Sequence, residues 1–107
     1  MTQARAGITL GALRARRQEI LRVASAYGAS NIRVFGSVAR GEADEASDVD
    51  LLVDIHTEAR GFAYFGVLGD LRRALADLLG RDVDVIDSAV LAPGRVRAEV
   101  LAEAVPL

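Results

Sequence analysis

The chain has 107 residues, of which 51% are hydrophobic and 26% charged, a composition typical of one globular domain. Its formal net charge of −2 leaves no basic excess for neutralising many phosphates, so we expect no strong direct binding to nucleic acid. Cysteine and lysine are absent, which excludes disulfides, thiolate zinc sites and catalysis through a covalent cysteine or lysine adduct.

The sequence also argues against a membrane location. No apolar run approaches the roughly 20 residues needed to cross a bilayer. The first residues, MTQARAG, lack the apolar stretch of a signal peptide. We therefore expect a cytoplasmic protein with a single domain over residues 1–107 and no membrane partner.

The first predicted element is a helix over residues 9–27. Thr9 is a suitable N-cap, Gly28 is a suitable end, and apolar residues recur between them at helical spacing. Three arginines fall mostly on the opposite face, which we interpret as solvated surface rather than as a binding patch. They are Arg14, Arg16 and Arg17.

Short strands then alternate with helices. The expected elements are a strand over 31–35, a short helix over 37–40, a polar loop over 41–47, a strand over 48–55, a connection over 56–62, a helix over 63–79 capped by Gly80, a strand over 82–87, a turn at 93–94 and a helix over 95–104. We expect Phe65 and the leucines after it to form the core face of the long helix, with Tyr64 partly exposed. The order predicts an α/β or α+β fold in which helices flank a small sheet of three or four strands.

Two aspartates stand at the start of the second strand, in an otherwise apolar run. Because side chains alternate along a strand, Asp48 and Asp50 share one face, with Cα atoms roughly 6–7 Å apart. The valines and leucine between and after them point to the other face, towards the helices. Carboxylates in apolar surroundings are costly unless paired or metal-bound, so this spacing indicates a Mg²⁺ site.

A third carboxylate comes from the strand over 82–87. Asp84 lies between two core-facing valines, and it joins Asp48 and Asp50 if the two strands are neighbours. It could then bind metal and accept a proton from an attacking hydroxyl. Asp82 and Asp54 are weaker candidates, because the first is expected to be exposed and the second lies four residues beyond Asp50.

A glycine–serine turn precedes these aspartates. Gly36 and Ser37 stand where a strand passes into a helix, and backbone N–H groups at a helix start bind anions, with glycine allowing close approach of a phosphate. Arg40, one turn later, could meet phosphate charge. The sequence thus predicts a site for phosphate and divalent metal together.

With these residues in place, the chain resembles the minimal nucleotidyltransferase (MNT) family of the DNA polymerase β-like superfamily. The shared motif is a Gly-Ser turn, then Asp-x-Asp, then a later strand aspartate, with Arg40-Gly41 and Ser47 matching the smaller family. The resemblance covers about residues 31–107. It implies a mixed sheet, Mg²⁺ and ATP as substrate. Gly36, Ser37, Arg40 and Ser47 would bind the nucleotide. Asp48, Asp50 and Asp84 would bind metal and catalyse transfer.

The resemblance also implies a partner. Many MNT proteins resemble antitoxins paired with HEPN-domain toxins, which they are thought to adenylylate on a tyrosine. The short chain leaves no residues for the helical domain of small-molecule nucleotidyltransferases, so we expect the acceptor to come from another protein. Two alternatives stay open: an antitoxin that neutralises by binding only, and a small-molecule nucleotidyltransferase. A hetero-oligomer is expected, with a homo-oligomer as a further option.

Several residues keep two interpretations. His56 is either polar surface or a neighbour of the nucleotide. Gly61, Phe62 and Tyr64 form either a base-stacking or partner surface, or the edge of a helix whose Phe65 is core. Residues 91–107 offer an apolar face either for oligomerisation or for core packing.

Overall fold

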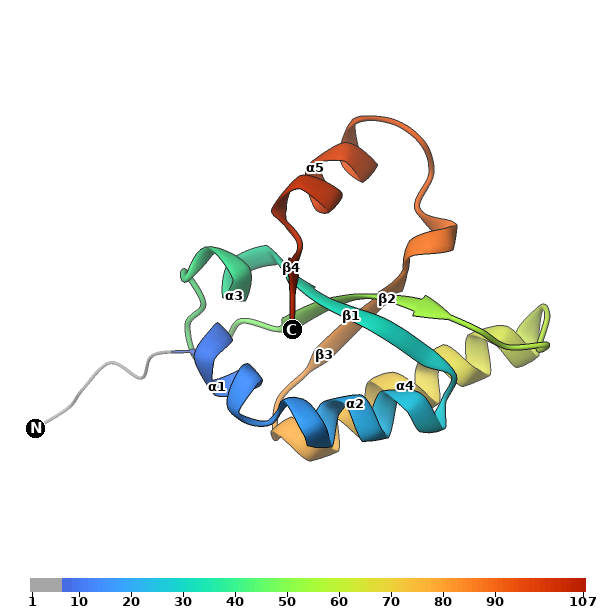
Figure 1. Ribbon diagram of the computed structural model, residues 1–107, viewed down its shortest axis with the longest axis horizontal. Helices are drawn as coiled ribbons and strands as arrows, with labels where there is room; N and C mark the ends of the chain where they lie inside the picture. Colours follow the sequence, from blue (N-terminus) through green and yellow to red (C-terminus); the bar gives the residue numbers. More distant parts are fainter. Residues whose placement is uncertain (1–6) are drawn as a thin grey trace, which may run out of the picture.

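A four-stranded mixed sheet organises the chain (Figure 1). The computed structural model describes residues 7–107, so the segment on which the signal-peptide expectation rests lies largely outside the described residues. Strand order is β3-β2-β1-β4; β2 pairs antiparallel with β1 and parallel with β3, and β1 pairs antiparallel with β4. The strands are β1 (Ala29–Phe35), β2 (Val49–Ile55), β3 (Val83–Asp87) and β4 (Val105–Pro106). This confirms the predicted small mixed sheet flanked by helices.

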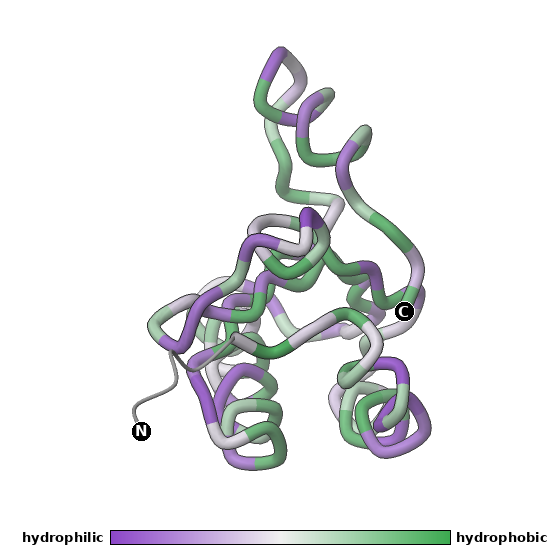
Figure 2. The backbone as a smooth tube through the Cα atoms, turned by 90° about the vertical axis from the view of Figure 1, so that its left-hand side faces the viewer, coloured by the Kyte–Doolittle hydropathy of each residue, from purple (hydrophilic) through white to green (hydrophobic). Residues whose placement is uncertain are grey.

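Helices lie on both sides of this sheet (Figures 1 and 2). They are α1 (Leu10–Ala15), α2 (Arg17–Ala26), α3 (Gly36–Arg40), α4 (Phe62–Leu79) and α5 (Arg95–Glu103), with a short 3₁₀ helix η1 (Ser88–Val90). Helices α2 and α4 pack together below the sheet, while α5 stands off on the opposite side (Figures 1 and 2). None of the helices along residues 7–107 is both long and apolar enough to cross a membrane.

Strand alternation divides the sheet into a core face and an open face. Val49, Leu51 and Val53 of β2 are fully buried against the helices, as predicted, together with Val83 and Val85 of β3. The residues between them therefore point to the face that α2 and α4 do not cover. That open face carries Asp50, Asp54 and Asp84.

The predicted first helix is two helices. The chain turns at Arg16, whose N–H donates to the carbonyl of Leu13 at 3.0 Å in a tight three-residue turn. The Arg16 side chain donates from Nη1 to the Leu78 carbonyl at 2.8 Å, which satisfies a free C=O in the last turn of α4. Thr9 caps α1 as predicted, accepting from the Ala12 N–H at 3.0 Å.

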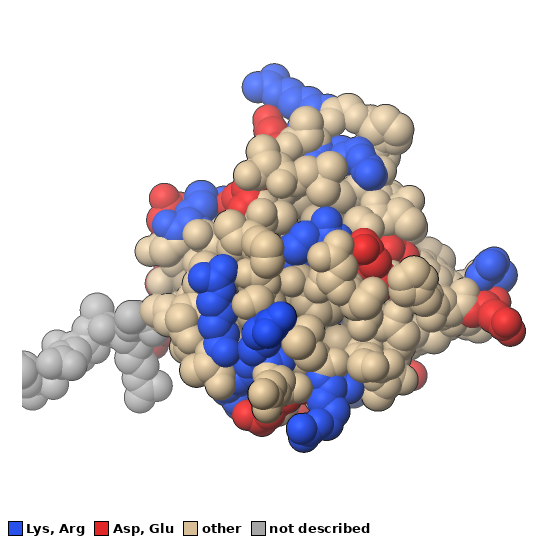
Figure 3. All heavy atoms as spheres, viewed as in Figure 1, with Lys and Arg blue, Asp and Glu red and all other residues tan. Residues whose placement is uncertain are grey.

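The arginine cluster of α1 and α2 is only partly a solvated face. Figure 3 shows its basic side chains gathered over these helices. Arg14 donates from Nη2 to the Pro106 carbonyl at 2.8 Å, and thereby ties α1 to the C-terminal strand β4. Arg14 and Arg17 are exposed as expected, while Arg16 is partly buried, and Arg14 and Arg16 also act as structural hydrogen-bond donors.

Phe65 is 68% exposed, so its prediction as a core residue is wrong. The buried stripe of α4 consists of Leu68, Leu71 and Leu75, and Tyr64 continues it one turn earlier with its ring packed against the core. Phe65 lies about 100° around the helix from Tyr64, on the solvent side. Gly80 ends α4 in the left-handed conformation, as predicted.

Two further boundaries differ from the sequence prediction. Strand β2 begins at Val49, so Asp48 is the residue that enters the strand rather than part of it. A two-residue strand, β4, follows α5. No residue of α5 is buried. A strand of two residues is too short to show a period of its own.

Candidate active site

Asp50 and Asp84 lie side by side on the open face. In the parallel pairing of β2 with β3, Asp50 is the direct Cα partner of Asp84. Neighbouring strands are about 4.8 Å apart, so the two carboxylates arise from adjacent backbone positions. The prediction that the strand of Asp84 adjoins the strand of Asp50 is confirmed.

Asp48 approaches the same pair from the loop before β2. The strand entry is fixed by the Val49 N–H, which donates to the Asp82 carbonyl at 3.0 Å. Asp48 and Asp84 share the lining of a hollow of about 390 Å³ between β3 and α4, together with Asp82, Gly69 and Arg72. Asp48 therefore lies near Asp84 at this edge of the sheet, and its charge also acts on Asp50.

Gly36 presses against the Asp50 carboxylate. Phe35, the last residue of β1, is the cross-strand partner of Asp50, so the turn after it lies beside the aspartate. A Cβ on Gly36 would stand 2.2 Å from Oδ2 of Asp50, and Gly36 has a φ of +74°. The left-handed backbone favours glycine here, and any side chain at this position would also displace the Asp50 carboxylate.

The electrostatics of Asp50 reflect this crowding. Its pKa is raised, first because burial removes water from the carboxylate and then because Asp84 and Asp48 add negative charge. Glu103 acts in the same direction, and Arg40 acts against it. A carboxylate in such a field is stabilised by a bound cation.

Ser37 and Ser47 occupy the two loops that border the aspartates. Ser37 is half-buried in α3, and its carbonyl accepts from the Glu42 N–H at 2.9 Å. Ser47 closes a turn with Asp44: its Oγ accepts from the Asp44 N–H at 3.0 Å and lies 3.1 Å from Asp44 Oδ1. Ser47 thus shapes the loop that delivers Asp48.

Arg40 is engaged by two glutamates. It donates from Nε to Glu42 at 2.9 Å and from Nη1 to Glu103, the last residue of α5. Contact with phosphate, which the sequence predicts for Arg40, requires an exchange of these partners. Sequence reasoning missed Glu103, because nothing local connects positions 63 residues apart.

Arg72 is the second residue that the sequence did not reveal. Its Nη2 lies 3.0 Å from Asp84 Oδ1 and donates to the Val85 carbonyl at 3.0 Å. With Asp84 held in this way, the three aspartates do not converge. Across residues 7–107, no three Asp, Glu or His side chains are grouped closely enough to hold a metal ion.

The donor chemistry nevertheless fits a hard divalent cation. Asp50 and Asp84 are strand neighbours, and Asp48 lies near enough for its charge to act on Asp50. Carboxylate oxygens are the ligands that Mg²⁺ prefers, and the negative charge around Asp50 favours added positive charge. Asp54, by contrast, is engaged by protein groups: it accepts from Asn31 at 3.0 Å, from Arg33 at 2.9 Å and from Ser88. Its oxygens are therefore not free for an ion at Asp50.

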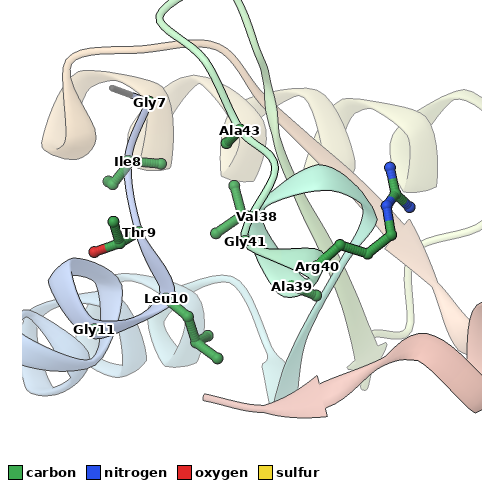
Figure 4. A pocket seen from close by; sticks show the side chains of 10 residues that line it. All are labelled: Gly7, Ile8, Thr9, Leu10, Gly11, Val38, Ala39, Arg40, Gly41 and Ala43. Atoms are coloured by element: carbon green, nitrogen blue, oxygen red, sulfur yellow. The ribbon is translucent and has the colours of Figure 1, made fainter. Parts of the chain in front are cut away.

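A separate hollow of about 410 Å³ lies between the segment 7–11 and α3 (Figure 4). Its lining is mostly apolar, and the Thr9 hydroxyl within it already caps α1. Figure 4 shows the Arg40 guanidinium turned away from this space. Since the hollow touches neither the aspartates nor the Gly36-Ser37 turn, it is distinct from the candidate site.

Comparison with known proteins identifies the family of this fold. Residues 18–107 match the family described as "Polymerase beta, Nucleotidyltransferase". With the mixed sheet and its neighbouring aspartates, this match defines a nucleotidyltransferase domain. The chain belongs to the polymerase β nucleotidyltransferase family, which confirms both the resemblance seen in the sequence and its assignment to a class of enzymes.

Two archaeal relatives are similar in sequence. "Protein adenylyltransferase MntA" of Thermococcus cleftensis is 39% identical over 79 residues, which are 74% of this chain and 75% of that protein. MJ0128 of Methanocaldococcus jannaschii is 40% identical over 60 residues, 56% of this chain. The matched region spans 57% of the length of MJ0128.

Two solved structures share the fold. One that carries the name of a minimal nucleotidyltransferase is 48% identical, with a TM-score of 0.76, and the match covers 94% of this chain and 97% of that one. A crystal structure of a toxin–antitoxin with AMP-PNP is 22% identical, with a TM-score of 0.66, covering 83% of this chain and 69% of that one. At that identity the second match concerns the fold alone.

Proposed function

We propose that this protein transfers AMP from ATP to a hydroxyl group, a tyrosine in our hypothesis, on a partner toxin of the HEPN class. It would thereby act as a cytoplasmic antitoxin in a hetero-oligomer. The MntA relative, named as a protein adenylyltransferase, supports the choice of nucleotide and of a protein acceptor. The family assignment supports nucleotidyl transfer.

The observation that carries the proposal is the contact between Gly36 and Asp50. The turn that offers backbone N–H groups lies directly against a carboxylate whose strand neighbour is Asp84. An anion bound at the turn would therefore stand beside acidic side chains, and this is favourable only with a cation between them. Phosphate and Mg²⁺ together satisfy both halves of the site.

Each residue then has a defined role. Asp48 and Asp50 would hold Mg²⁺, with Asp84 completing the set; when bound, Mg²⁺ neutralises the charge of the triphosphate. Gly36 and Ser37 would bind phosphate through backbone N–H groups and the Ser37 hydroxyl, and Arg40 would add positive charge. Ser47 would support the nucleotide from the loop before β2.

The transfer requires only ATP and the acceptor hydroxyl as reactants. The acceptor oxygen attacks the α-phosphorus of ATP, a new P–O bond forms, and the bond to pyrophosphate breaks. The proton of the hydroxyl passes to Asp84. Pyrophosphate and the adenylylated partner are the products.

The test is transfer of label from [α-³²P]ATP to the partner in the presence of Mg²⁺. We expect labelling by the wild type and by Asp77→Ala, which removes an exposed aspartate of α4 that lines a different hollow, with Tyr27 and Asp70. We expect none from the double variant Asp48→Ala/Asp50→Ala.

Neutralisation of the toxin in cells separates catalysis from binding. If the double variant protects cells as well as the wild type does, the protein acts by covering its partner and the catalytic proposal fails. If the double variant leaves the toxin active while still binding it, modification is the cause of protection.

A further inference from the structure

Arg72 reaches the open face of the sheet from the helix that packs on the other face. Helix α4 lies against the core face, and β3 is the edge strand, so the outward carbonyls of β3 have no strand partner. The Arg72 guanidinium uses that free edge: it donates to the Val85 carbonyl at 3.0 Å and lies 3.0 Å from Asp84 Oδ1. Its path around the edge brings a positive charge to the aspartates.

The next residue shows that this placement is specific. Arg73 points along the helix surface and pairs with Asp70 at 3.2 Å, one turn earlier on α4. Both arginines line the hollow that contains Asp48 and Asp84, but only Arg72 binds one of these aspartates. Arg73 is therefore a matched control of equal charge.

Asp84 is also the one site aspartate with an arginine partner. Within residues 7–107, neither Asp48 nor Asp50 forms an ion pair. The Arg72–Asp84 pair is about half exposed on both sides, at 47% and 46%, so water screens it and a stronger cation can displace it. The ion pair between Arg72 and Asp84 can therefore open when a divalent cation binds Asp84.

We propose that Arg72 is a resident counter-cation: it holds Asp84 when no metal is bound, and it lowers the affinity of the three aspartates for divalent cations because it must release Asp84 to them. The inference rests on the proposed function, since it assumes that these aspartates bind metal. Arg72 is a positioning residue, not a catalytic one. It prevents the carboxylate cluster from holding metal tightly in the absence of nucleotide.

The direct test is titration of nucleotide-free protein with Mn²⁺, with binding monitored by electron paramagnetic resonance. We expect Arg72→Gln, which keeps a donor for the Val85 carbonyl but removes the charge, to bind Mn²⁺ about three- to tenfold more tightly than wild type. Arg72→Lys and Arg73→Gln should stay within about twofold of wild type, because the first keeps the charge beside Asp84 and the second removes a charge that pairs with Asp70 and with none of the site aspartates.

A double-mutant cycle with Asp84→Asn separates the contribution of the ion pair to Mn²⁺ affinity from any effect of Arg72→Gln on folding. Arg72→Gln should change Mn²⁺ affinity less in the Asp84→Asn background than in wild type, because the ion pair is already broken. Equal affinities of wild type and Arg72→Gln, or an equal increase with Arg73→Gln, would overturn the inference.

Asp50→Asn separates this outcome from failure of the proposed function. If Asp50→Asn binds Mn²⁺ as wild type does, these aspartates hold no metal, and both proposals fail. If Asp50→Asn loses Mn²⁺ while Arg72→Gln is unchanged, only the role of Arg72 is wrong.

Discussion

Asp50 and Asp54 occupy the same face of the same strand, four residues apart, yet their surroundings are opposite. Asp54 accepts hydrogen bonds from Asn31, Arg33 and Ser88, and its pKa is lowered, chiefly by the Ser88 hydroxyl. Asp50 has Asp84 as its strand neighbour, and its pKa is raised by burial and by adjacent carboxylates.

The difference separates a carboxylate that stabilises the fold from one that, in our proposal, binds a ligand. A buried or half-buried polar group is normally satisfied by the protein, as Asp54 is. The Asp50 end of β2 leaves its negative charge unbalanced, which costs stability and is expected where a cation binds. Four substitutions test this comparison, from the largest expected effect to the smallest.

Gly36→Ala should have the largest effect on the stability of the folded protein, because an added Cβ meets the Asp50 carboxylate. We expect AMP transfer to fall by about 100-fold or more and the free energy of unfolding to fall by about 2–3 kcal/mol, from the collision and the left-handed backbone. Gly41→Ala is the control: Gly41 has the same φ of +74°, but a Cβ there meets nothing within 4 Å. It should lose about 1–2 kcal/mol and keep its activity. Equal activity losses in kinetic assays of both variants would remove the special role of Gly36.

Asp54→Asn should destabilise the protein without impairing transfer per folded molecule. Loss of charge-assisted hydrogen bonds should lower the free energy of unfolding by about 1 kcal/mol at pH 7, a value reduced by the partial exposure of Asp54. Since the folded-state pKa is lowered, this stabilisation exists above the unfolded pKa of about 3.9 and is lost as pH falls through the folded pKa. Urea unfolding at pH 7 and near pH 3 should show the difference between variant and wild type shrinking in acid.

Asp50→Asn should abolish activity and yet raise the melting temperature. The raised pKa means that ionised Asp50 destabilises the folded state at neutral pH, and that protonation relieves the cost as pH falls. We expect a gain of about 2–5 °C at pH 7, measured without metal, that fades towards pH 4. A lower melting temperature at pH 7 would show that Asp50 is satisfied by the protein after all.

Glu103→Gln should have the smallest effect. It releases Arg40 from the α5 carboxylate and frees it for phosphate, so we expect KM for ATP to fall by about two- to fivefold, the scale of one exposed ion pair. Glu99→Gln, whose arginine partner is Arg95 within α5 itself, should leave KM unchanged. An increase in KM for Glu103→Gln would mean that the α5 contact holds Arg40 in its working position.

Much of this site follows from strand alternation alone. The apolar residues around Asp50 and Asp84 predict which face each occupies, whereas Asp48 lies before β2 and outside the alternation. The structure adds that Gly36 contacts Asp50 directly, a consequence of the pairing of Phe35 with Asp50 that no local pattern encodes.

The contacts that sequence reasoning missed all depend on which elements become neighbours. The path of Arg72 to Asp84 exists because β3 is an edge strand, and the bond from Ser88 to Asp54 depends on how η1 folds back on β2. Phe65 fails for a different reason: Tyr64 and Phe65 both suit a core stripe by hydrophobicity, and only the helix phase set by Leu68 and Leu71 decides between them.

The most direct test of the comparison is the change in melting temperature caused by Mg²⁺ and ATP in three proteins: wild type, Asp50→Asn and Asp54→Asn. A ligand that binds the folded state raises the melting temperature. We predict a rise for wild type and for Asp54→Asn, and none for Asp50→Asn. A full rise for Asp50→Asn, or its loss in Asp54→Asn alone, would contradict the assignment of the Asp50 end of β2 as the nucleotide and metal site.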